Sequence, residues 1–150
     1  MPEKIIVDTS SLIALEKIEL LEVLCKIYAE IILPKAVINE FGTPYIDCYI
    51  VKEVKNPLVR LLISELNLGK GESEVIALAS ETGIKTIIDD LKARQVAEKL
   101  GIKVTGTIGI LIKAEEARLI NNAYEKAKEL REKGFYVSDE LLDEIKKFLK

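Results

Sequence analysis

The side chains in this 150-residue sequence that are best suited to chemistry are carboxylates, because histidine is absent. Ser-His-Asp triads, Cys-His pairs and His-ligated zinc sites all need an imidazole and are therefore excluded. Asp8 directly follows the apolar run at residues 5–7, and the pair Asp89-Asp90 follows residues 86–88. An enzyme with this sequence must use carboxylates, hydroxyls, amines or thiols, and the acids at these run ends are the first candidates.

Two glutamates could reach the same region. Glu40 lies near the end of the helix expected after the second strand, and Glu72 opens the helix that leads into the strand before Asp89. Like charges in one cleft raise each other's pKa, so converging carboxylates need a compensating cation. Mg²⁺ and Mn²⁺ take oxygen ligands, and a bound ion lowers the pKa of water and polarises a phosphate. The pattern predicts a site for one or two divalent ions and phosphodiester hydrolysis.

Each acid also has a purely structural interpretation. Asp8 could be only the N-cap of the next helix, and Glu40 only a solvated helix residue. Glu72 and Glu74 fall in a first helical turn, where acids complement the helix dipole. The acid pair at 89–90 is the hardest to explain in this way, because it comes directly after a buried strand.

The elements that must bring these acids together alternate between strands and helices. Apolar runs predict strands at 4–7, 30–33, 85–88 and 103–105, and a short edge strand within 43–56. Helical periodicity predicts helices at 12–18, 20–28, 34–41, 57–66, 72–82, 91–100, 106–117, 121–133 and 138–150. We expect one α/β domain over 1–150, with a parallel sheet, helices on both faces and C-terminal helices at about 121–150. Ligands of such sheets bind outside the carboxyl ends of the strands, where the acids are expected.

Composition narrows the class of protein further. The 22 Lys and Arg against 25 Asp and Glu give a formal charge of −3, which disfavours a strongly basic nucleic-acid module. Cys25 and Cys48 are too far apart for a CxxC motif and too few for a disulfide framework, so we expect a reducing cytoplasm. Charges at Glu3, Lys4 and Asp8 argue against a signal peptide or a membrane span near the start. The excess of Ile, Leu, Lys and Glu is typical of heat-adapted proteins.

Taken in order, these segments resemble the PIN domain family, named for the N-terminal domain of PilT-like proteins, over nearly the whole chain. IIVDTSSLIAL is similar to the family's opening strand, with Asp8 as its first acid and Ser10 as the nearby hydroxyl. VINEF matches the helix that carries the second acid, Glu40. GESEVIALASETGIKTIIDD is similar to the second half of the motif, with one acid before an Ala/Leu-rich helix and one after a strand.

The resemblance assigns the last two acids with alternatives. The third acid falls on Glu72, with Glu74 as the other choice. The fourth falls on Asp90, because the family's fourth acid commonly ends a Thr-x-Asp pattern, which makes Asp89 the intervening residue. Ile88 replaces the Thr of this pattern, so either aspartate could be the ligand. The catalytic acids implied by the resemblance are Asp8, Glu40, Glu72 and Asp90, and the metal ligands are these four together with Asp89.

The resemblance implies a three-layer α/β/α sandwich, an acidic Mg²⁺ or Mn²⁺ site, and endonucleolytic cleavage of single-stranded or structured RNA. TGTIGILIKAEEARLI and LREKGFYVSDELLDEI resemble a prokaryotic PIN subfamily of uncharacterised proteins, which is related to VapC-type toxins. A small antitoxin protein and a second copy of the chain, as a homodimer, are therefore candidate partners. The expected protein is a cytoplasmic ribonuclease and the toxin of a toxin-antitoxin pair.

Weaker signals lie near the predicted site. Lys92 and Arg94, just beyond the acid pair, could contact the RNA backbone or belong to a solvated helix face. Thr107, after the last strand, could meet a phosphate through its amide or hydroxyl, or be an ordinary N-cap. The GKG segment at 69–71 lacks the Walker spacing of a phosphate loop and is predicted to be a turn.

Two other functions compete with the nuclease. A non-catalytic PIN-fold protein that binds RNA or protein would use the same fold without turnover. A phosphoacceptor receiver also places carboxylates at strand ends around Mg²⁺, but its acid pair follows the first strand, whereas here the pair follows a late one.

Overall fold

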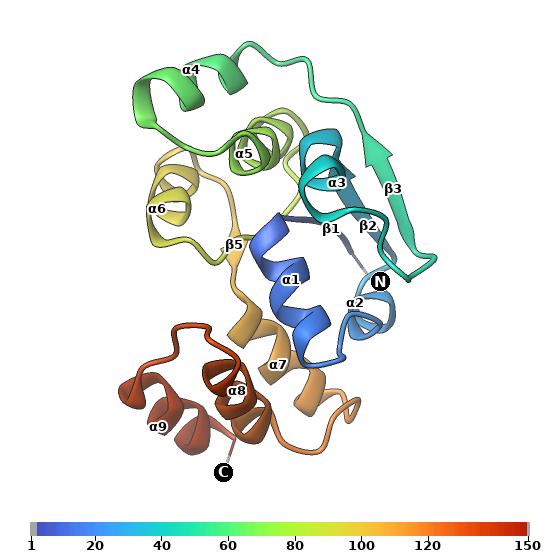
Figure 1. The fold of residues 1–150 in the computed structure, drawn as a ribbon, viewed down its shortest axis with the longest axis vertical. Helices are drawn as coiled ribbons and strands as arrows, with labels where there is room; N and C mark the ends of the chain where they lie inside the picture. The colour runs from blue at the N-terminus through green and yellow to red at the C-terminus, as the bar shows by residue number, and fades with distance from the viewer. Residues whose placement is uncertain (1–2, 150) are drawn as a thin grey trace.

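The sheet at the centre of the molecule contains parallel strands only. The computed structural model describes residues 3–149 and is shown in Figure 1. Its five-stranded sheet has the order β3-β2-β1-β4-β5, and every neighbouring pair is parallel. The strands are β1 (Lys4–Val7), β2 (Glu30–Pro34), β3 (Tyr49–Lys52), β4 (Thr86–Ile87) and β5 (Val104–Thr105). The predicted α/β class, a three-layer α/β/α sandwich with a central parallel sheet, is confirmed.

Helices cover the sheet and extend beyond it. α5 packs against α3, α4 and the central strands, whereas α7 contacts α1, α2 and α8. In Figure 1, α8 and α9 lie at the end of the molecule opposite α4. Within residues 3–149 no helix has the length and apolar character needed to cross a membrane. The helices are α1 (Thr9–Lys17), α2 (Val23–Ile27), α3 (Lys35–Phe41), α4 (Leu58–Leu66), α5 (Lys70–Thr82), α6 (Leu91–Lys99), α7 (Thr107–Glu116), α8 (Ala123–Glu132) and α9 (Asp139–Phe148).

The middle strands form the core because both of their faces are covered. Ile5 and Val7 of β1 and Ile31 and Leu33 of β2 are completely buried. β3 lies at the edge of the sheet, as predicted for the 43–56 segment, and its Val51 is 46% exposed. The acids that follow β1 therefore start from the most rigidly packed part of the molecule.

Two early helix boundaries differ from the prediction. α1 begins at Thr9 rather than at residue 12, because the Asp8 carboxylate caps it by accepting the Ser11 amide at 2.9 Å. The helix predicted at 20–28 is the shorter α2, Val23–Ile27.

The turn predicted at residues 69–71 is wrong. α5 begins at Lys70, and Gly69 is its N-cap residue. The Gly69 amide donates to Glu72 Oε1 at 3.2 Å, so the glutamate side chain satisfies the amide of the N-cap residue. The GKG segment is therefore the first turn of a helix.

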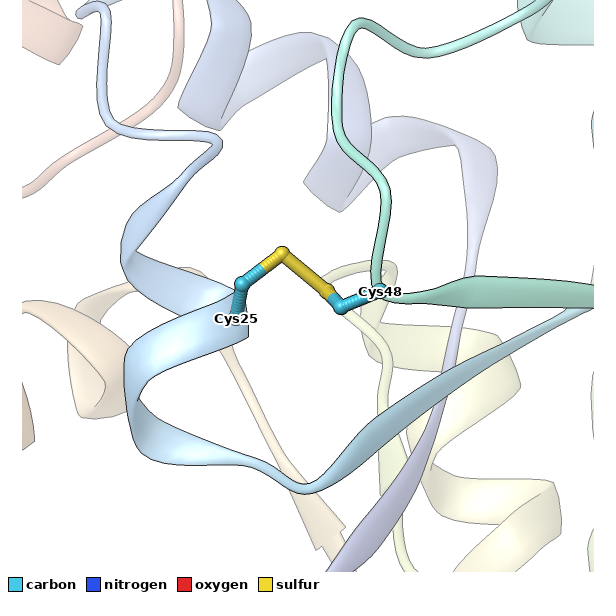
Figure 2. Close-up of a disulfide and its surroundings, with 2 residues drawn as sticks. All are labelled: Cys25 and Cys48. Atoms are coloured by element: carbon cyan, nitrogen blue, oxygen red, sulfur yellow. A yellow bond between two sulfur atoms is a disulfide. The ribbon is translucent and has the colours of Figure 1, made fainter.

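A disulfide joins Cys25 of α2 to Cys48, which directly precedes β3 (Figure 2). The two Cα atoms are 5.6 Å apart, although 23 positions separate the residues in sequence. They meet because the Ile31 amide of β2 donates to the Cys48 carbonyl at 2.9 Å, which aligns the start of β3 with the chain that leaves α2. The expectation of a reduced cysteine pair is corrected by this bond.

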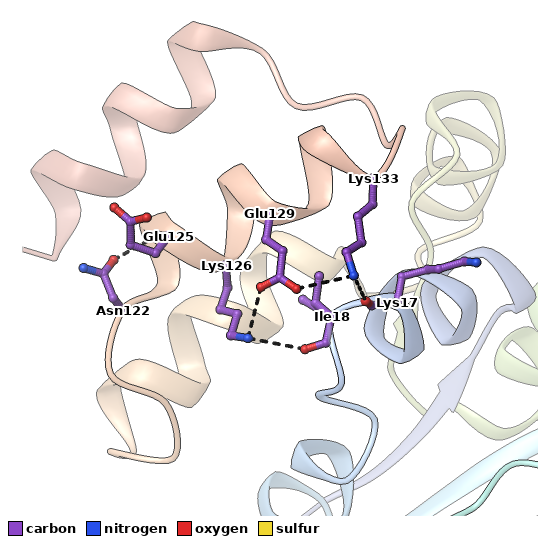
Figure 3. Close-up of polar contacts among 7 residues, drawn as sticks. All are labelled: Lys17, Ile18, Asn122, Glu125, Lys126, Glu129 and Lys133. Atoms are coloured by element: carbon purple, nitrogen blue, oxygen red, sulfur yellow. Dashed lines mark hydrogen bonds and ion pairs between the residues drawn. The ribbon is translucent and has the colours of Figure 1, made fainter.

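The C-terminal helices are fixed to the end of α1 by two lysines (Figure 3). Lys126 Nζ donates to the Ile18 carbonyl at 3.4 Å, and Lys133 Nζ donates to the Lys17 carbonyl at 3.0 Å. Glu129 pairs with both amines, at 3.1 and 3.8 Å. Cations at a helix C-terminus satisfy its last carbonyls. The predicted helices at 121–133 and 138–150 are thus α8 and α9, and residue 150 lies outside the described residues.

Candidate acidic site at the sheet edge

The ends of β1 and β4 bring two of the predicted acids to one edge of the sheet. Val7 pairs with Ile87, and the Asp8 amide donates to the Ile87 carbonyl at 3.1 Å. The Ser11 hydroxyl, in the first turn of α1, donates to Asp89 Oδ2 at 3.1 Å. Asp8 and Asp89 therefore share the carboxyl edge of the sheet, where ligands of such folds bind.

Asp8 is a buried carboxyl group with one unpaired oxygen. Only 1% of the residue is exposed, and Oδ1 accepts the Ser11 amide at 2.9 Å. Within residues 3–149, Oδ2 has no hydrogen-bond partner. Burial raises the pKa of Asp8 from 3.8 to about 7; the hydrogen bond from the Ser11 amide opposes the rise, and the charges of Asp89 and Glu72 add to it. The protein leaves this carboxylate without the counter-charge that its burial requires.

Asp89 is held by donors from two helices. Its Oδ1 accepts the Thr107 amide at 2.7 Å. Its Oδ2 accepts the hydroxyls of Thr107 at 2.5 Å and of Ser11 at 3.1 Å. Gly106 is the N-cap of α7, so the N-cap prediction for Thr107 is corrected. Thr107 instead fixes the carboxylate between α1 and α7.

Asp90 has a different role from its neighbour. It is the N-cap of α6, and its Oδ2 accepts the Ala93 amide at 2.9 Å. Both aspartates are exposed to solvent. The charge of Asp90 raises the pKa of Glu72, which puts the two carboxylates within electrostatic reach of each other. Asp89 accepts donors from α1 and α7, and Asp90 caps α6, so the acid pair contacts three helices at the carboxyl edge of the sheet.

Glu40 and Glu72 join the cluster from α3 and α5. The Thr9 hydroxyl donates to Glu40 Oε1 at 2.6 Å. Glu72 is half-buried, and burial raises its pKa, with the charges of Asp90 and Glu40 adding to the rise. The Glu40 carboxylate lies against Gly71, and a larger side chain there would displace it. Glycine at this position lets the start of α5 approach the second acid.

Comparison with known families identifies this domain. Residues 4–150 match the family model DUF3368, which describes a PIN domain. The chain belongs to the PIN domain family. Members are generally nucleases and typically use divalent metal ions. Among curated proteins, none matches the chain.

Two secondary candidates in this PIN domain have different surroundings. Glu74 is 6% exposed, and its Oε1 accepts the Ala36 amide at 3.0 Å. Ala36 lies in the first turn of α3, where Pro34 supplies no side-chain cap. Glu74 therefore satisfies an otherwise unpaired helix amide. Ser10 lines a hollow beside Asp89.

Sequence reasoning missed the hydroxyls that hold the acids of the PIN domain. Ser11 contacts both Asp8 and Asp89, and Thr9 contacts Glu40. Ser11 had a local signal, because it is three residues after an N-cap and its amide is the expected donor. The Thr9 contact spans 31 positions, and no local pattern indicates it.

Two cations lie beside the acids. Arg94 is half-buried, its Nη1 donates to the Ile88 carbonyl at 3.4 Å, and its guanidinium lies over Gly106, where a larger side chain would collide with it. Lys92 is exposed, and its charge lowers the pKa of Glu72. In the described part of the chain neither residue forms an ion pair.

The donor set of the PIN domain fits a hard divalent cation, although its side chains do not enclose a common point. Within residues 3–149, no three His, Cys, Asp or Glu side chains form a group that could hold a metal ion. The acids at the edge offer only oxygen ligands, which Mg²⁺ and Mn²⁺ prefer, and in the described part of the chain Asp8 Oδ2 has no hydrogen-bond partner.

Proposed function

We propose that this PIN domain is a metal-dependent endoribonuclease that hydrolyses RNA phosphodiester bonds. The proposal rests on the buried Asp8 carboxylate beside Asp89 and Glu72, whose Oδ2 has no hydrogen-bond partner among residues 3–149. A buried charge of this kind is costly unless it is paired or coordinates a metal. A divalent ion would remove the cost and give the cluster a catalytic use.

The side chains divide into those that hold the ion and those that hold these ligands in place. Asp8, Glu40, Glu72 and Asp90, together with Asp89, would hold Mg²⁺ or Mn²⁺. When bound, the ion supplies a water of lowered pKa and polarises the phosphate.

Amide and hydroxyl donors fix two of these acids before any ion binds. The Ser11 amide donates to Asp8, and the hydroxyls of Ser11 and Thr107 both donate to Asp89. Lys92 and Arg94 would contact the RNA backbone beyond the acid pair, because neither is neutralised by an ion pair in the described part of the chain.

The setting that we propose is the cytoplasm of a heat-adapted prokaryote, with the whole chain acting as a single VapC-like toxin domain. The likeness of its C-terminal segments to a toxin-related subfamily supports a small antitoxin as partner and a homodimer as the assembly. The Cys25–Cys48 disulfide supports heat adaptation, since disulfides are rare in cytosolic proteins except in hyperthermophiles.

One observation favours the second candidate, a non-catalytic PIN-fold factor that binds RNA or protein. Several acids already have internal partners: Asp90 caps α6, Glu72 accepts the Gly69 amide, and Glu40 accepts the Thr9 hydroxyl. In that case the carboxylates would serve the fold, and the wild-type protein would bind RNA without cutting it.

Cleavage of single-stranded RNA in the presence of Mn²⁺ tests the proposal. We expect the wild type to cut, and Asp8→Asn and Asp90→Asn to lose on the order of 100-fold in rate. Glu3→Gln is the control, because Glu3 is an acid at the opposite edge of the sheet, where it pairs with Lys85. Equal cleavage by all variants would identify a contaminating nuclease and contradict the proposal.

A further inference from the structure

A hollow of about 610 Å³ lies between the acidic edge and the C-terminal helices, and its lining is polar at the acids and apolar elsewhere, including at Ala14, Val104 and Ile108. The polar wall contains Asp89, Asp90, Arg94 and Thr107. The apolar wall comes from α8, α9 and the segment between them, and contains Leu130, Phe135, Tyr136, Val137 and Leu141.

The aromatic residues of the apolar wall are presented by an anchored segment. Val137 is 5% exposed and packs in the core, and the Phe135 amide donates to the Leu130 carbonyl at 3.1 Å. Between these anchors Tyr136 is 92% exposed, and Phe135 is half-buried. The fold therefore holds an aromatic ring in solvent beside the acids.

The wall is also fixed relative to the acids. α8 is tied through Lys126 and Lys133 to the last carbonyls of α1, the helix that begins after Asp8 (Figure 3). One rigid helix thus connects the first acid to the segment that carries Tyr136.

We propose that this hollow binds a nucleobase of single-stranded RNA, stacked on Tyr136, with the neighbouring phosphate on Arg94. This subsite rests on the proposed function, because it lies next to the acids that would act on the RNA. A base has an apolar face for the ring and polar edges for the opposite wall. Base-aromatic stacking is a common means of holding single strands.

The polarity of the hollow at the acids favours a base over a protein segment. An amphipathic partner helix would need an apolar groove, whereas here one wall carries two carboxylates and a guanidinium that forms no ion pair within residues 3–149. The Arg94 charge matches a phosphate, and Gly106 leaves space for the guanidinium.

Tryptophan fluorescence tests the subsite directly, because the chain contains no tryptophan. Tyr136→Trp keeps a stacking ring and introduces a single reporter. The matched control is Tyr45→Trp, since Tyr45 is 93% exposed but lines a different hollow, with Glu22 and Lys26. The probes are a ten-nucleotide oligouridylate and the same backbone without bases, in metal-free buffer at low salt, where no cleavage is needed.

We expect oligouridylate to quench the fluorescence of Tyr136→Trp strongly and that of Tyr45→Trp weakly, and the abasic backbone to quench neither. Tyr136→Ala should weaken oligouridylate binding on the order of tenfold, and Tyr136→Phe should restore it. Similar quenching of the two tryptophan variants would overturn the inference. Equal quenching of Tyr136→Trp by oligouridylate and by the abasic backbone would also overturn it. So would an unchanged RNA affinity of Tyr136→Ala combined with weaker binding to a protein partner or a second copy.

These outcomes are separable from the nuclease proposal. Base-dependent quenching without Mn²⁺-dependent cleavage would support the base subsite and contradict the nuclease proposal. Cleavage by the wild type with an unaltered KM in Tyr136→Ala would keep the nuclease and reject the subsite.

Discussion

Charged side chains have different partners at the amino and carboxyl ends of the parallel strands, here called the amino edge and the carboxyl edge. At the amino edge, Glu3 pairs with Lys85 at 3.2 Å, and Lys4 pairs with Glu30 at 3.6 Å. The Cys25–Cys48 disulfide fixes the start of β3 near the same edge. At the carboxyl edge the acids have hydroxyl and amide donors, but within residues 3–149 no ion pair involves them.

We interpret the ion pairs of the amino edge as structural and the carboxylates of the carboxyl edge as available to a ligand. Paired charges in solvent contribute little and cost little. An unpaired carboxylate in the interior, such as Asp8, is costly, and a fold keeps one where a function compensates for the cost. The comparison therefore predicts large effects at the carboxyl edge and small ones at the amino ion pairs.

The largest effect should be the pH dependence that Asp8 imposes on stability. Between about pH 4 and pH 7 the native state holds a proton on Asp8 that the unfolded state has lost, so without metal the free energy of unfolding falls as the pH rises. The loss should be on the order of 4 kcal/mol by pH 8. Asp8→Asn should remove this pH-dependent loss, as measured by urea unfolding of the wild type and the variant between pH 4 and pH 8.

Parallel pH curves for the wild type and Asp8→Asn would show that the carboxyl group titrates normally and that the two edges do not differ. Glu3→Gln is the control, and its curve should follow the wild type.

Loss of the disulfide should have the next largest effect, and only on stability. A loop of this size contributes about 3 kcal/mol, so a variant with Cys25→Ser and Cys48→Ser should unfold at lower urea. Below its melting temperature the variant should bind Mn²⁺ like the wild type. A loss of Mn²⁺ affinity would show that the two edges are coupled.

A smaller effect is expected where Thr107 holds Asp89. Thr107→Val keeps the shape but removes the hydroxyl that donates at 2.5 Å, and should cost about 1.5 kcal/mol of unfolding free energy. Thr107→Ser is the matched variant, and it should retain most of the unfolding free energy that the hydroxyl contributes. Equal losses in both would assign the effect to packing instead of the hydrogen bond.

The smallest effect is expected at the amino edge. Lys85→Met removes the partner of Glu3 from an exposed pair and should change the unfolding free energy by less than about 1 kcal/mol. Mn²⁺-dependent cleavage should be unchanged. A larger loss in either measurement would contradict the contrast between the edges.

Local patterns predicted most of the fold. β1, α3 and α6 follow from apolar runs and from breakers such as Gly42, where the backbone of the C-cap has a φ of 96°. Parallel pairing then places Asp8 and Asp89 at one edge, as strand ends require. The shared edge was predictable because it depends only on strand direction.

Contacts between distant elements could not be predicted. Glu74 caps α3 across 38 positions, and the cysteines meet only because β3 adds to β2. The aromatic wall at Tyr136 depends on how α8 packs against α7 and on the two lysine-carbonyl contacts that link it to the end of α1. Such contacts have no periodic signature in the sequence.

Calorimetric titration with Mn²⁺ at pH 8, with Asp8→Asn compared against Glu3→Gln, tests whether Asp8 binds the metal ion. We expect the wild type and Glu3→Gln to bind Mn²⁺ alike, and Asp8→Asn to lose at least about tenfold in affinity. Equal affinities in all three proteins, or no binding to the wild type, would contradict the claim that the unpaired carboxylate is kept for a metal ion.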